Sequence, residues 1–85
     1  MNYPKTSTLD YIIESLNDYV GFHSYGLINW HDLIKSKIKL LIELDDDRLN
    51  NVISELQALT DDTWCENIVS VIDSLEHINT LFRLD

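Results

Sequence analysis

Cys65 and His77 are the residues whose types best suit nucleophilic catalysis, in which an imidazole takes a proton from a thiol. Both fall in a stretch, from Thr63 to about Leu81, whose apolar periodicity predicts one helix. At a rise of 1.5 Å per residue, the two lie about 18 Å apart along that helix. A thiol and its base need a separation of about 3 Å. Cys65, next to Trp64, is therefore expected to be a small buried hydrophobe.

The histidines lack the spacing of metal ligands. No His-x3-His or Cys-x2-Cys pair occurs, and His23 and His31 flank a predicted loop. Asp73 and His77 stand four residues apart, which is typical of an exposed pair on one helix face. The sequence therefore predicts no zinc site.

Three consecutive acids, Asp45, Asp46 and Asp47, invite comparison with calcium-binding loops. An EF-hand loop alternates its oxygen ligands, contains a central glycine and has a glutamate at position twelve. Here no glycine follows, and position twelve counted from Asp45 is Leu56. Gly21 and Gly26 are the only glycines of the chain, and the sequence contains no Gly-rich phosphate-binding loop and no nucleophile elbow. We expect no metal, no cofactor and no catalytic activity.

Helices are the elements that must position these residues. Apolar residues make up 45% of the 85 residues, and scarce glycine and proline favour long regular elements. Apolar residues recur at helical spacing over residues 8–20, 30–44, 47–59 and 63–81. We therefore predict an all-α fold, a small antiparallel four-helix bundle of two helical hairpins, as a single domain over residues 1–85. Two stacked hairpins are also the unit of an α-solenoid, which the sequence leaves open.

Capping residues define the predicted helix ends. The N-caps are Ser7 with Asp10, Asn29 with Asp32, the acids at 45–47, and Thr63 with Glu66. Gly21 is expected to end the first helix in the left-handed conformation.

Residues 34–40 also alternate nearly as a strand would. A helix is favoured because Asp32, Lys39 and Glu43, with residues 35–36, form one helical polar stripe. No second strand is evident to pair with, and a lone strand is not viable.

Charge is the most distinctive property of the chain. The net charge is −9; residues 1–44 hold four lysines against five acids, whereas residues 45–85 hold two arginines against ten acids. Such a surface repels nucleic acid and anionic lipid, so we expect no direct contact with nucleic acid or a membrane. A basic protein is the expected partner. The acids predicted to bind it are Asp45, Asp46, Asp47, Glu55, Asp61, Asp62, Glu66, Asp73 and Glu76.

A second predicted surface is aromatic. Residues 22–30 are rich in aromatic side chains, and Tyr25 and Trp30 are candidate anchors for a partner. The alternative is that they close the end of the bundle. Helix 30–44 also carries an apolar stripe (Trp30, Leu33, Leu40, Leu44) beside its main seam, which predicts either the central helix of the core or a homodimer contact.

The N-terminus has no apolar run behind Lys5, and the longest aliphatic run spans residues 40–42. We therefore expect neither a signal peptide nor a membrane span. A single cysteine cannot form an internal disulfide, so a cytoplasmic location is the simplest expectation.

In length, charge and helix count the chain is similar to the small four-helix immunity proteins of nuclease bacteriocins. It lacks their Asp-Tyr-Tyr-Pro motif, so no residue role is transferred. The leading hypothesis is an immunity protein or antitoxin that blocks a basic toxin such as a nuclease, or an inhibitor that mimics nucleic acid to disarm a defence enzyme. The alternatives are a helical adaptor or assembly subunit and a chaperone for a secreted effector.

Overall fold

A computed structural model of the chain describes residues 3–22, 29–60 and 62–84. These residues form four α-helices and one 3-10 turn: α1 (Tyr3–Phe22), α2 (Trp30–Leu44), η2 (Asp47–Leu49), α3 (Asn50–Gln57) and α4 (Trp64–Leu84). No strand occurs among them. The all-α prediction is confirmed, and the strand alternative at residues 34–40 is wrong because these residues form the middle of α2.

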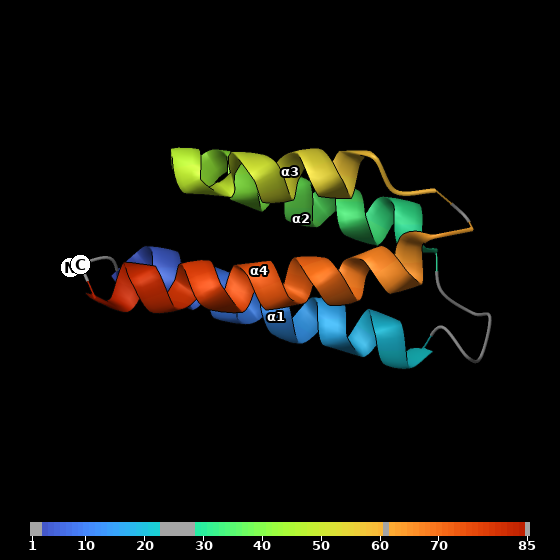
Figure 1. The fold of residues 1–85 in the computed structure, drawn as a ribbon, viewed down its shortest axis with the longest axis horizontal. Helices are drawn as coiled ribbons and strands as arrows, with labels where there is room; N and C mark the ends of the chain where they lie inside the picture. The colour runs from blue at the N-terminus through green and yellow to red at the C-terminus, as the bar shows by residue number, and fades with distance from the viewer. Residues whose placement is uncertain (1–2, 23–28, 61, 85) are drawn as a thin grey trace.

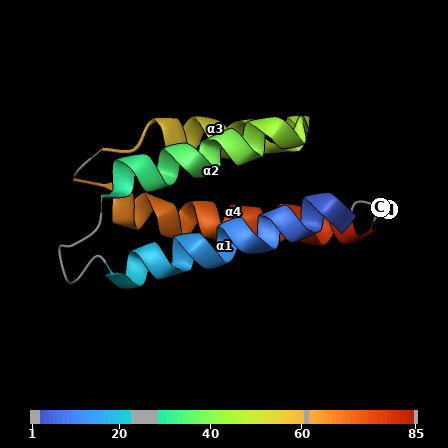
Figure 2. The ribbon, with the colours of Figure 1, turned by 180° about the vertical axis from the view of Figure 1, so that it is seen from behind.

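The helices lie in two layers of two. The α1–α4 layer has the most extensive contacts, and α2 packs against α3 in the second layer (Figure 1). Successive helices run in opposite directions along the 40 Å long axis. In Figure 1 the nearer face is formed by α3 and α4, and the view from behind in Figure 2 places α1 and α2 on the opposite face. Residues 1–44 and residues 45–85, which differ in net charge, therefore form opposite faces of the bundle.

One continuous apolar core joins all four helices. Leu9, Ile12 and Leu16 of α1 are completely buried, as are Leu41 of α2 and Leu75 of α4. α4 contributes the largest share of buried residues: Trp64, Ile68, Val71, Ile72, Leu75, Ile78 and Phe82. This spacing of three and four residues keeps one stripe of α4 inward and leaves its other side exposed.

The ends of α1 differ from the prediction. α1 begins at Tyr3, so Ser7 is an exposed residue within the helix and does not cap it. Pro4 lies in the first turn, where its missing N–H leaves no hydrogen bond unmade. The prediction for Gly21 is also wrong, because the helix continues through it to Phe22. Glycine permits the left-handed conformation without requiring it.

The other helix ends agree more closely with the sequence. α2 has the predicted bounds, although Asn29 donates its side-chain hydrogen bond to Asp32 Oδ2 (3.1 Å). The third helical segment begins with the 3-10 turn η2, and α3 ends at Gln57, two residues before the predicted end. Before α4, the hydroxyl oxygens of Thr60 and Thr63 lie 2.8 Å apart in a hydrogen bond.

Candidate functional site

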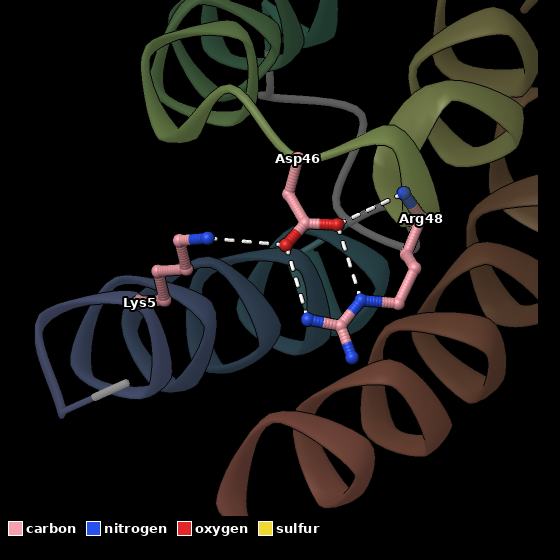
Figure 3. Close-up of polar contacts among 3 residues, drawn as sticks. All are labelled: Lys5, Asp46 and Arg48. Atoms are coloured by element: carbon pink, nitrogen blue, oxygen red, sulfur yellow. Dashed lines mark hydrogen bonds and ion pairs between the residues drawn. The ribbon is translucent and has the colours of Figure 1, made fainter. Parts of the chain in front are cut away.

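The Asp46 carboxylate is the centre of a polar cluster that joins three parts of the chain (Figure 3). Oδ1 accepts hydrogen bonds from the backbone N–H (2.9 Å) and Nε (3.1 Å) of Arg48. Oδ2 accepts from Arg48 Nη2 and from Lys5 Nζ of α1, both at 3.1 Å. The Arg48 guanidinium carbon also lies 4.2 Å from the ring centroid of Phe82 on α4. This cluster ties the α2–α3 connection to α1 and α4.

These contacts give Asp46 a structural role. Its side chain is only 11% exposed, and both oxygens are occupied by partners within the chain. Hydrogen bonds from the Arg48 side chain, with smaller contributions from the Arg48 backbone and Lys5, hold the pKa of Asp46 well below its usual range, although burial opposes them. Asp46 was predicted as a partner-binding residue, but no oxygen remains free for that purpose.

Asp45 and Asp47 differ from Asp46, although the three are adjacent. Asp45 ends α2 in the left-handed conformation (φ 52°, ψ 53°), and its N–H donates to the Ile42 carbonyl (3.1 Å). Asp47 opens η2. Both residues are exposed, and neither forms an ion pair with a residue that the structure describes. They are available to a partner at the end of the bundle where α1 begins.

The outer side of α4 carries a row of carboxylates. Glu66, Asp73 and Glu76 are exposed, and spacings of seven and three residues keep them on one side of the helix. Val69 lies between Glu66 and Asp73 and is 48% exposed. None of the three acids forms an ion pair within the described part of the chain. The row is therefore a free anionic surface with an apolar residue in its middle.

Glu55 extends this surface onto α3. It lines a pocket of about 300 Å³ together with Ala58, which directly follows α3, and with Asn67 and Ser70 of α4. Asp62 is exposed two residues before α4, where a negative charge is favoured by the helix dipole. We refer to Glu55, Glu66, Asp73 and Glu76 as the acidic face, with Asp62 near the start of α4.

The arginines of the second half of the chain do not neutralise the acidic face. Arg48 is directed to Asp46, and Arg83 pairs with Asp10 of α1 at 3.0 Å. The local imbalance of charge that the sequence predicts is thus preserved in three dimensions.

Trp30, one of the aromatic residues predicted to contact a partner, lies in the interior. Trp30 is 9% exposed and stacks on Trp64, with ring centroids 5.8 Å apart and an angle of 11° between the planes. It therefore belongs to the core, and little of its surface is left for a partner. Leu40 and Leu44 of the predicted stripe are half-buried against the same core. The predicted contacts at Tyr25 and Asp61, and the loop at 23–28, lie outside the described residues.

Sequence reasoning missed a buried cation. Lys37 of α2 is 5% exposed, and its Nζ lies 5.0 Å from the Tyr11 ring centroid and 5.7 Å from that of Tyr19. Its Nζ also donates to Ser36 Oγ (3.3 Å). The only signal in the sequence was that Lys37 interrupts an apolar stripe of α2.

No group of three or more His, Cys, Asp or Glu residues suited to a metal ion occurs in the described ranges. Nor does any helix there have the length and hydrophobicity needed to cross a bilayer. The fold and its surface define a small four-helix bundle with one acidic face. No protein-family model, curated protein or solved structure matches the chain.

Proposed function

We propose that this protein is a non-enzymatic inhibitor of the immunity-protein or antitoxin type, which binds a basic protein and covers its active site. A toxin nuclease is the kind of partner that fits best, because a nuclease must present lysine and arginine side chains to phosphate groups. An inhibitor that mimics nucleic acid to disarm a defence enzyme would use the same chemistry. The proposal depends on the free carboxylates of the acidic face.

The arrangement of charges supports this function. Glu66, Asp73 and Glu76 are exposed and unpaired within the described chain, while Arg48 and Arg83 contact acids elsewhere. Complementary charge accelerates encounter with a basic partner and disfavours anionic competitors. After encounter, the bundle blocks access to the partner's active site by its bulk. No bond is made or broken in this mechanism.

The acidic face is small enough to be covered by a single partner. Glu66 and Glu76 are ten residues apart, which corresponds to about 15 Å along α4. A protein interface of ordinary size buries about 800 Å² on each partner, enough to cover this row and Glu55 together. Val69 in the middle of the row offers apolar area that excludes water from the neighbouring ion pairs.

Affinity capture tests the proposal. The purified protein is immobilised, exposed to lysate of its native host at low salt, and eluted with a salt gradient. We expect a basic protein to elute as salt rises, and its nucleic-acid cleavage to be blocked by one equivalent of the inhibitor. Elution of acidic proteins alone, of further copies of this chain alone, or of a basic protein whose activity is unaffected would contradict the proposal.

A further inference from the structure

A groove between α2 and α3 is lined mainly by apolar side chains, in contrast to the acidic face. Its apolar floor includes the buried side chains of Ile34 and Leu56 and the half-buried Ile38 and Leu59, and it encloses about 370 Å³. Trp30 lines one end. Lys35 and Gln57 are exposed polar residues along it, one from each helix.

This groove continues onto the outer side of α2. Lys35 and Ile38 also line a second, open trough of about 720 Å³, which includes Lys39 and Ile42. Ile42 is 54% exposed, which makes it the most exposed isoleucine among the described residues. From Trp30 to Ile42 the combined surface, here called the α2 groove, is about 18 Å long. An open surface of this length matches about three turns of a helix.

The lysines of the α2 groove have no anionic partner among the residues that the structure describes. Lys35 and Lys39 are exposed, one turn apart, and neither forms an ion pair with a described residue. Asp32 and Glu43 lie towards the two ends of the trough, and Asp32 accepts a hydrogen bond from Asn29. The groove is thus positive in its middle and negative towards its ends.

We propose that the α2 groove binds an amphipathic helix of another protein, with apolar residues towards Ile38 and Ile42 and carboxylates near its middle that pair with Lys35 and Lys39. Binding of an amphipathic helix in an apolar groove is a common mode of recognition. This surface is separate from the acidic face, so the protein would join a basic partner to an acidic helical one.

Synthetic helical peptides test the inference. The probe is a set of peptides of about 15 residues with leucines at helical spacing and glutamates beside them in the middle turn, in three leucine spacings. A matched set carries lysine in place of glutamate. Binding is followed by calorimetry and by tryptophan fluorescence, because Trp30 lines the groove. We expect at least one glutamate peptide to bind at least tenfold more tightly than its lysine counterpart.

Variants of the protein locate the binding. Lys35→Glu combined with Lys39→Glu should weaken the glutamate peptide at least tenfold and relieve the discrimination against the lysine peptide. Ile42→Ser should weaken both sets. These residues are exposed, so circular dichroism should show an unchanged helical signal. Amide substitutions on the acidic face should leave peptide affinity unchanged, which separates this inference from the proposed function.

Four results would overturn the inference: no binding by any glutamate peptide, equal binding by the lysine peptides, affinity unchanged in the double lysine variant, or a dimer of the chain that this variant dissociates. The last result would assign the groove to a second copy.

Discussion

Arg83, near the end of α4, donates hydrogen bonds from Nη2 to both carboxylate oxygens of Asp10 on α1, each at 3.0 Å. The buried Asn79 donates to Oδ1 of the same carboxylate (2.6 Å). The basic residue of α4 is therefore paired with α1, its neighbour in the same layer, and forms no ion pair with Asp73 or Glu76. The acid row of α4 is thus left without an ion-pair partner in the described ranges, which makes it available to a basic partner.

Asp46→Asn should destabilise the fold. The carboxylate presents two acceptor oxygens to Arg48 and Lys5, whereas an amide keeps one acceptor and turns an NH2 group towards cationic donors. Hydrogen bonds to charged groups contribute about 1.5–3 kcal/mol when buried, and Lys5 and Arg48 are partly exposed. We expect a loss of about 1–2 kcal/mol in the free energy of unfolding, measured with urea at pH 7.

The same variant should reveal the pH dependence of this cluster. Because the pKa of Asp46 is lower in the folded state than in the unfolded chain, its stabilisation is full above about pH 5 and is lost progressively as the pH falls below that value. The difference between wild type and Asp46→Asn should therefore shrink between pH 4 and pH 2. The neighbouring Asp47→Asn is the control, and its effect should stay within about 0.5 kcal/mol. A difference for Asp46→Asn that grew on acidification would contradict this account.

Asp45→Gly should stabilise the protein. Asp45 has a left-handed backbone conformation, which costs an L-residue about 1–2 kcal/mol, and it places a negative charge at the C-terminal end of α2. Glycine removes both costs but gives the unfolded chain more freedom, so a net gain of about 0.5–1 kcal/mol is expected. Thermal unfolding measures it. Asp47→Gly, within the 3-10 turn, should destabilise the protein. Stabilisation by both changes would contradict the explanation from the left-handed conformation of Asp45.

Lys37→Met tests whether the buried cation contributes to stability. The Lys37 ammonium lies against the rings of Tyr11 and Tyr19, with no carboxylate near it in the described part of the structure. Desolvation of a charge generally exceeds the roughly 0.5–2 kcal/mol supplied by cation–π contacts. Methionine fills a similar volume, so we expect the free energy of unfolding to rise by about 1 kcal/mol. Lys39→Met, at an exposed site, should change it by less than about 0.5 kcal/mol. A loss of more than 1 kcal/mol in Lys37→Met would show that the cation–π contacts dominate.

Periodicity predicted the helices because it reports which side of each element meets the core. The bounds of α2 followed from the spacing of Ile34 and Leu41 and from the flanking polar residues. The start of α1 did not follow, because both Ser7 and the turn containing Pro4 satisfy local rules for a helix beginning. Where two local signals for a helix start are of similar strength, tertiary packing selects one of them. A single sequence does not display that packing.

The candidate site was less predictable because its acids differ through contacts that the sequence does not display. Asp45, Asp46 and Asp47 look equivalent in the sequence, but the middle one is set apart by Arg48, two residues along the chain, and by Lys5, 41 residues away. Trp30 was ambiguous for the same reason, since the stacking partner Trp64 belongs to another helix. The acids of α4 could be assigned to one side because a single helix fixes their relative directions.

The central claim is that the acidic face selects a basic partner. Its most direct test is the association rate constant of the captured partner, measured at about 50 and 500 mM salt for three proteins. These are the wild type, an acidic-face variant (Glu55→Gln, Glu66→Gln, Asp73→Asn, Glu76→Gln), and a control with the same change in charge on α1 and α2 (Glu14→Gln, Asp18→Asn, Asp32→Asn, Glu43→Gln).

We expect wild type and control to associate at least tenfold more slowly at high salt, and the acidic-face variant to be slow at both salt concentrations while it retains its helical signal. Equal rates for the acidic-face variant and the control at low salt would contradict the claim, because charge at any position would then serve equally well.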